Sequence, residues 1–143
     1  MNGPSEHLTW DELACHNSDK TPYPERWRED RAVLLGEVFE LIRQESGSHP
    51  LKVLSGYRTT QHNIKIGGSR NSQHVLGRAL DLNPPEGWTV DQFHSLIRNL
   101  ANSGRVIRGL GKYPTFVHVD VRPSMSLVSW IGTGLKDNRI ASR

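Results

Sequence analysis

Apolar residues recur at steps of three and four between residues 25 and 45, which predicts the first long helix of the chain. Gly47 is a suitable stop signal beyond its C-terminal end. A second helix is predicted from Thr89 to Gly104, because Thr89 and Gln92 form a capping-box pattern ahead of another apolar stripe. The side chains expected to face the core are Trp27, Val33, Leu34, Val38, Leu41 and Ile42 from the first helix, and Val90, Phe93, Leu96, Ile97 and Leu100 from the second.

Shorter apolar segments separated by glycine and proline are typical of strands. Strands are predicted over 51–57, 78–82, 106–110 and 116–121, a short helix over 59–66, and one or two helical turns within 8–13. The last two strands form an antiparallel hairpin, joined through Gly111 and Pro114. This order predicts an α+β fold in which helices pack on one side of a small antiparallel sheet and leave its other face open.

The 143 residues correspond to a single domain, 1–143, with an N-terminal segment at 1–20 and a flexible tail at 135–143. The net charge of +3 includes no basic run, so nucleic-acid binding is not expected. No apolar run approaches the ~20 residues of a membrane span, so no membrane partner is expected either. Because Cys15 is the only cysteine, no internal disulfide can form. The first residues do not resemble a signal peptide, which predicts synthesis in the cytoplasm.

Two histidines and an aspartate are the best candidates for metal ligands. Gly77 permits a sharp turn between His74 and the strand that carries Asp81, and alternation places His118 and Asp120 on one face of a later strand. Two imidazoles and a carboxylate suit a catalytic zinc, because three protein ligands leave the fourth position for water. Spacing alone leaves open an ordinary polar cluster in a fold without metal.

Three motifs follow one another along the chain. They are Ser55-Gly56-Tyr57-Arg58-Thr59, Ser72-x-His74-x-x-Gly77-x-Ala79-x-Asp81 and His118-x-Asp120. In this order they resemble the M15 family of zinc D-Ala-D-Ala peptidases, and most closely its small single-domain branch, from about Leu8 to Trp130. The resemblance implies a fold shared in outline with the hedgehog signalling domain. It also implies Zn²⁺ bound by His74, Asp81 and His118 on the open face of the sheet.

The resemblance also places Arg58 beside the zinc, where its guanidinium could donate to an oxyanion or to a substrate carboxylate. The residue type alone would equally fit a surface arginine. Tyr57 and Ser72 match motif positions and are candidates for substrate binding. Tyr57 could instead pack in the core, and Ser72 could orient His74.

The general base has to be assigned where this chain departs from the family pattern. Many family members carry an acidic residue three positions before the last histidine ligand, where this chain has Thr115. Asp120 is therefore the candidate base, because it is the nearest acid and shares the strand face of His118. Its alternative role is to hold His118 or Arg58 in place. Because histidine ligands must be neutral, zinc affinity is expected to fall below about pH 6.

These assignments imply a zinc metallopeptidase that hydrolyses peptide bonds in the stems or crosslinks of bacterial peptidoglycan. It would be a D-Ala-D-Ala carboxypeptidase if Arg58 binds the terminal carboxylate, and an endopeptidase if the cleft is open at both ends. The expected setting is a monomeric, phage-type lysis enzyme that is made in the cytoplasm and acts at the cell wall. The alternative is a non-catalytic zinc-containing module that binds the cell wall or a protein, an alternative supported by Thr115.

Overall fold

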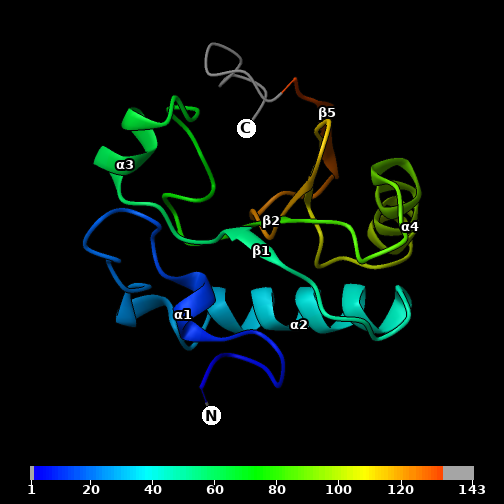
Figure 1. The fold of residues 1–143 in the computed structure, drawn as a ribbon, viewed down its shortest axis with the longest axis horizontal. Coiled ribbons are helices and arrows are strands. Elements are labelled where there is room, and N and C mark those ends of the chain that lie inside the picture. The colour runs from blue at the N-terminus through cyan, green and yellow to red at the C-terminus, as the bar shows by residue number, and fades with distance from the viewer. Residues whose placement is uncertain (1, 134–143) are drawn as a thin grey trace.

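A five-stranded mixed sheet forms the centre of the computed structural model, which describes residues 2–133 (Figure 1). In spatial order its strands are β1 (Val53–Ser55), β2 (Ala79–Leu82), β4 (Val117–Asp120), β3 (Gly109–Lys112) and β5 (Val128–Ile131). The helices are α1 (Trp10–Leu13), the 3-10 helix η1 (Glu25–Trp27), α2 (Arg31–Glu45), α3 (Thr60–Lys65) and α4 (Val90–Ser103). The predicted α+β class is confirmed, whereas the predicted tail at 135–143 lies outside the described residues.

The prediction of a purely antiparallel sheet needs one correction. β1, β2, β4 and β3 pair antiparallel in that order, and the predicted hairpin is β3–β4, although β3 begins at Gly109 rather than Val106. The edge strand β5 pairs parallel to β3 and was not predicted. Its order comes from pairing with β3, which the sequence of the four residues does not indicate by itself.

The first long helix is also shorter than predicted. Residues 25–27 form the separate helix η1, and α2 begins after Asp30, whose side chain accepts a hydrogen bond from the Arg31 N–H group. The predicted apolar face is only partly right, because Val38 and Ile42 are buried whereas three other predicted members are 39–43% exposed. The exposed three are Val33, Leu34 and Leu41, and the side chains buried instead are Ala32, Leu35 and Phe39. The buried stripe is therefore rotated around α2 from the predicted one, toward the side that packs under the sheet.

The second long helix, α4, agrees with the prediction in its bounds, and of its predicted apolar face Phe93 and Ile97 are buried whereas Val90, Leu96 and Leu100 are half-buried. Its capping box is present, since the Thr89 hydroxyl accepts from the Gln92 N–H group and the Gln92 side chain accepts from the Thr89 N–H group. Phe93 and Ile97 are fully buried and anchor α4 against the sheet. No helix within residues 2–133 has the length and apolar character needed to cross a membrane.

Alternation along β2 and β4 gives the sheet one apolar and one polar face. Leu80 and Val119 pack into the core with α2 and α4, and α2 lies along one side of the sheet (Figure 1). Asp81 and His118 point to the opposite face, and the β2–β4 register sets them directly opposite each other. The polar face of the sheet therefore carries the candidate ligands.

Candidate metal centre

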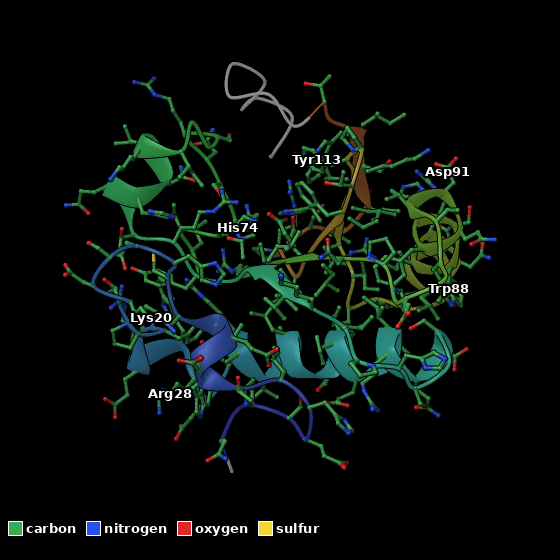
Figure 2. All side chains as sticks on the ribbon, viewed as in Figure 1. Lys20, Arg28, His74, Trp88, Asp91 and Tyr113 are labelled. Carbon is green, nitrogen blue, oxygen red and sulfur yellow. The ribbon has the colours of Figure 1, made fainter. Side chains whose placement is uncertain are left out.

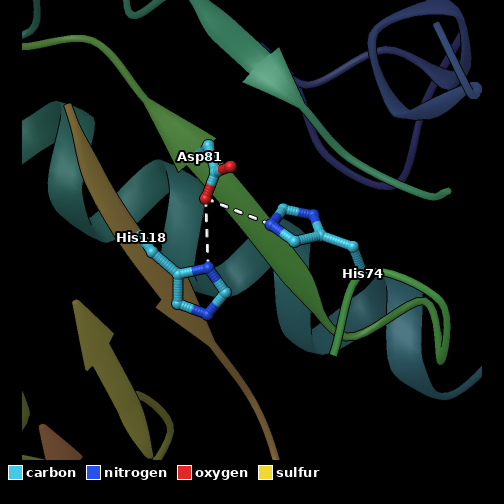
Figure 3. Close-up of side chains that lie close together, drawn as sticks. All are labelled: His74, Asp81 and His118. Carbon is cyan, nitrogen blue, oxygen red and sulfur yellow. Dashed lines mark hydrogen bonds and ion pairs between the residues drawn. The ribbon is translucent and has the colours of Figure 1, made fainter. Parts of the chain in front are cut away.

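The structure brings His74, Asp81 and His118 together (Figure 3). Oδ1 of Asp81 lies 3.1 Å from Nε2 of His74 and 3.0 Å from Nδ1 of His118. The three potential ligand atoms lie within 4.8 Å of one another, and all three residues are buried. Two imidazole nitrogens and a carboxylate oxygen at this separation could bind one metal ion.

The turn that carries His74 is fixed by contacts with its neighbours. His74 lies between α3 and the strands (Figure 2). The Ser72 hydroxyl accepts a hydrogen bond from the His74 backbone N–H group at 3.2 Å. The Arg58 backbone N–H group donates to the His74 backbone carbonyl at 3.1 Å. Gly77 completes the turn with φ of +68°, and a side chain at this position would collide with Trp27. These contacts lead the chain from His74 directly into β2.

The ring of His74 is oriented to offer Nε2 as a ligand. Its Nδ1 lies 2.7 Å from the Gly56 carbonyl oxygen, which can only accept a hydrogen bond, so Nδ1 carries the proton and Nε2 has a free lone pair. Nε2 is buried and has no hydrogen-bond partner among the described residues, although Asp81 Oδ1 is close to it. The short distance reflects proximity of two potential ligand atoms rather than a directed hydrogen bond. A metal ion bound here would satisfy this buried nitrogen.

The ring of His118 is also held by a contact at one nitrogen, here from a carboxylate, so that its other nitrogen faces Asp81. Its Nε2 lies 2.8 Å from Oδ2 of Asp120, which leaves Nδ1 facing Asp81. A carboxylate on the second ring nitrogen of a metal-binding histidine fixes the ring and its tautomer. The donor set and its orientation therefore fit a metal ion.

Asp120 is fully buried, and four hydrogen bonds hold its carboxylate. Besides His118, the donors are the backbone N–H, Nε and Nη2 groups of Arg122, at 3.1, 2.8 and 2.7 Å. These contacts match the supporting role for Asp120, in which it holds His118 in place. The general-base role stays a prediction, and Thr115, at the position where relatives carry an acid, is exposed on the β3–β4 connection.

Arg58 lies beside the cluster, as predicted from the motif. Its Nη2 donates to Oδ2 of Asp81 at 3.2 Å, its Nε donates to Ser55 at 3.0 Å, and its Nη1 donates to Asn63 at 3.1 Å. The side chain is only 11% exposed, so burial fixes its orientation. Three of its five N–H groups are used in these contacts, and no other partner within residues 2–133 is found for the remaining two, which could bind a substrate oxygen.

The two predicted substrate-binding residues occupy different surroundings. Tyr57 packs edge-on against Tyr23 and Trp27, with ring centroids 6.2 and 6.1 Å apart, which matches its alternative role in packing. Ser72 is 1% exposed and supports His74. A substrate-binding role for either residue stays a prediction.

Two glycines of β3 make room on the polar face of the sheet. A side chain at Gly109 would collide with the Asp120 carboxylate, and one at Gly111 would collide with the Trp130 indole. Trp130 can therefore lie over the strand, where its ring centroid is 5.1 Å from that of His118. Glycine is therefore required at both 109 and 111, so that Asp120 and Trp130 can take their places on this face.

Asn63 and Arg122 are parts of the site that the sequence analysis missed. Arg122 follows Asp120 by two positions, so the alternation used for His118 and Asp120 could have found it. Asn63 had no comparable signal, because its contact with Arg58 depends on how α3 lies against the strand that precedes it.

The buried charges of the cluster depend on one another. Burial disfavours the charged form of His118, but hydrogen bonds to Asp120 and Asp81 outweigh this and raise its pKa to about 9. Burial alone would raise the pKa of Asp81, yet the two histidines hold that pKa well below its usual range. Burial and the charge of Arg58 lower the pKa of His74. Without metal, His118 is therefore a cation between two carboxylates at neutral pH.

Metal binding is expected to release a proton from His118. With its pKa raised to about 9, His118 must lose a proton before Nδ1 can bind a metal at any lower pH. At about pH 7.5, roughly one proton should be released per metal bound, and affinity should rise about tenfold per pH unit up to about pH 9. Protons therefore compete with the metal for His118 up to about pH 9, well above the pH of about 6 that is expected from an unperturbed histidine.

Calorimetric titration with zinc in two buffers of different ionisation enthalpy measures this release. Asn in place of the exposed Asp91 is a suitable control, because Asp91 contacts Lys112 at the surface rather than the cluster. Absence of proton release at about pH 7.5 would contradict the assignment of His118 as a ligand with a raised pKa.

Comparison with known protein families agrees with this geometry. A family profile described as peptidase M15 matches residues 6–120, which include all three clustered residues and most of the chain. No curated protein sequence matches the chain significantly. The chain therefore belongs to the peptidase M15 family, whose members are metal-dependent peptidases.

Proposed function

We propose that this protein is a zinc-dependent metallopeptidase that hydrolyses peptide bonds in the stems or crosslinks of bacterial peptidoglycan. The observation that carries the proposal is the position of Asp81 Oδ1 between His74 Nε2 and His118 Nδ1, within a matched peptidase family. This donor set suits zinc and leaves a coordination position for water. When bound there, zinc would supply a Lewis acid and lower the pKa of its water to about 7.

Arg58 is assigned to the substrate oxygen. Its guanidinium is held by Asp81, Ser55 and Asn63, so its two remaining N–H groups have a fixed direction. Such preorganised donors stabilise charge that develops on an oxyanion, and they also bind a terminal carboxylate. The first use would suit an endopeptidase and the second a carboxypeptidase.

Replacing Arg58 with Lys is expected to lower turnover by roughly tenfold or more, because the ammonium group keeps the charge but loses the planar fork. Zinc binding should remain, since Arg58 contacts Asp81 Oδ2 and not the oxygen between the histidines. Steady-state kinetics and zinc stoichiometry measure the two effects, with Arg105→Lys, at an exposed position, as the matched control. Unchanged kinetics would place Arg58 outside the reaction.

Asp120 is assigned here to holding His118. Asp81 and Asp120 are the only carboxylates among residues 2–133 that lie within 4.0 Å of His74 or His118. All four hydrogen bonds of the Asp120 carboxylate are made to His118 and Arg122. Substitution of Asp120 by Asn separates this role from the general-base role predicted from sequence.

Incubation of the zinc-loaded protein with purified peptidoglycan tests the proposal. New amines and new carboxylates should appear in equal amounts, and mass spectrometry of the products identifies the bond that is cut. Removal of the metal by a chelator, and the Asp81→Asn variant, should each abolish the products. A zinc-loaded protein that releases no product from any peptidoglycan would contradict the proposal.

The second candidate is a non-catalytic zinc-containing module that binds the cell wall or a protein. It is favoured by the exposed Thr115 and by the fully occupied carboxylate of Asp120, which leave no free acid beside the cluster among the described residues. Such a module would bind zinc and peptidoglycan without producing new amines. Action at the cell wall and a lysis role, including a phage-encoded one, belong to our proposal and rest on the proposed substrate. A monomeric state is also part of the proposal.

A further inference from the structure

A cleft of about 1030 Å³ lies between α3, the segment 68–75 and Arg122. It adjoins the metal centre, because Gln73 and Val75, which flank His74 in the chain, both line it. The cleft therefore lies next to the turn that presents the first histidine.

Two further lining residues touch the residues that surround the centre. Asn63 accepts the hydrogen bond from Arg58, and Arg122 is the residue that holds Asp120. A peptide bound in the cleft would thus approach the centre from a wall that shares residues with it. The three clustered residues do not line the cleft themselves, so it lies beside the centre and shares its supporting residues.

The cleft carries positive charge. Arg70 and Arg122 line it, and none of the described residues that form its wall is acidic. Arg122 is paired with Asp120, whereas no carboxylate among residues 2–133 lies within 4.0 Å of the Arg70 guanidinium. Arg70 is exposed, so its charge faces whatever occupies the cleft.

The neighbouring centre does not offset this charge. Asp81 is paired with Arg58 and Asp120 with Arg122, so each carboxylate of the centre has its own arginine. A divalent cation would add further positive charge. The combined field attracts anionic groups into the cleft and disfavours cationic ones.

Buried contacts fix the backbone that carries Arg70. Asn63 is 3% exposed, and its side-chain amide donates to the Ser69 backbone carbonyl at 2.8 Å. The backbone carbonyl of Asn63 accepts a hydrogen bond from the Gly68 backbone N–H group at 2.8 Å. Gly68 has room for no side chain, because a Cβ would collide with Asn63. Asn63 therefore connects the turn before Arg70 to Arg58.

We infer that this cleft binds a carboxylate of the peptide substrate and that Arg70 is the specificity-determining residue that recognises it. The inference rests on the proposed function, because it requires a peptide substrate. A guanidinium pairs with a carboxylate through two parallel hydrogen bonds, and amide and hydroxyl side chains of the wall, such as Asn71 and Thr60, suit the peptide backbone beside it. The carboxylate could belong to a side chain or to the C-terminus of the substrate.

The test compares a peptidoglycan stem pentapeptide that ends in D-Ala-D-Ala with two derivatives. One derivative has its side-chain carboxylates, and the other its C-terminal carboxylate, converted to carboxamide. Affinity is measured by calorimetry on the metal-free protein, and kcat/KM is measured on the zinc-loaded protein. The acid form should bind about two- to tenfold more tightly than one of the derivatives, which identifies the carboxylate. Arg70→Gln should reduce this ratio to about one, and Arg70→Lys should keep part of it.

Arg105→Gln removes the same charge from an exposed position that does not line the cleft, and it should leave the ratio unchanged. A preference that survives Arg70→Gln, or no preference in the unmodified protein, would overturn the inference. Hydrolysis without any carboxylate preference would overturn it while leaving the peptidase function intact. A preference that depends on Arg70, in a zinc-loaded protein that hydrolyses nothing, would support it and contradict the proposed function.

Discussion

Replacing Asp81 with Asn should remove zinc binding and turnover together. Among residues 2–133, Oδ1 of Asp81 is the only carboxylate oxygen that lies beside both histidine ligand atoms, at 3.1 and 3.0 Å. The amide has nearly the same shape but no negative charge to offset that of Zn²⁺. The loss of affinity should exceed the roughly 10–100-fold that is typical when a residue supporting a ligand is removed.

The same substitution leaves Arg58 with a weaker partner. Its guanidinium is 11% exposed and would keep Ser55 and Asn63 but lose the charge of Asp81. Breaking a buried ion pair on one side can cost about 3–5 kcal/mol, although the amide oxygen of Asn still accepts a hydrogen bond and limits this cost. The variant should therefore be compared with the metal-free parent protein for its melting temperature.

Zinc stoichiometry at equal free zinc, with turnover on peptidoglycan, measures the effect of Asp81→Asn. Asp91→Asn is the matched control, because Asp91 forms a surface ion pair with Lys112. His74→Ala provides a second test that leaves Arg58 and Asp81 paired. If both site variants retain one tightly bound zinc, the metal centre lies elsewhere.

The cluster of His74, Asp81 and His118 could be predicted from the sequence because the family motifs name these residues, whereas their spacing alone left an ordinary polar cluster open. Strand alternation puts Asp81 and His118 on the polar face, and the motif spacing adds His74 before the turn at Gly77. The antiparallel register then brings Asp81 and His118 together. The pairing of β2 with β4 and its register were not predicted, so the structure supplies the last step that joins these two ligands.

Features that depend on packing between distant elements were not predictable in this way. The buried stripe of α2 is rotated from the expected one, because the sheet and α4 decide which side of the helix is covered. The edge strand β5 gains its order from β3, and its Trp130 reaches His118 only because Gly111 has no side chain. The link from Asn63 to Arg58 likewise requires the position of α3.

The role of Asp120 depends on which atom of His118 it contacts, and strand alternation cannot give this. Both residues lie on one face, which suits a base near the metal as well as a support for the ligand. In the structure Asp120 contacts Nε2 of His118, the ring nitrogen that faces away from Asp81, and Arg122 occupies the rest of its carboxylate. This geometry leads to a prediction that separates the two roles.

At about pH 9, where protons no longer compete for His118, Asp120→Asn should weaken zinc binding by about 10–100-fold, because the ring of His118 loses the charged partner that fixes it. At saturating zinc, turnover should stay within about tenfold of the parent, since no proton transfer is assigned to Asp120. Zinc affinity is measured by competition with a chelator of known strength, and turnover is measured at zinc concentrations that restore full occupancy. Arg122→Lys should produce a smaller change in the same direction, because Lys keeps the charge beside Asp120 but only one of its side-chain contacts. A variant that binds zinc as tightly as the parent but turns over 10²–10⁴-fold more slowly, roughly the contribution of a general base, would instead establish Asp120 as that base.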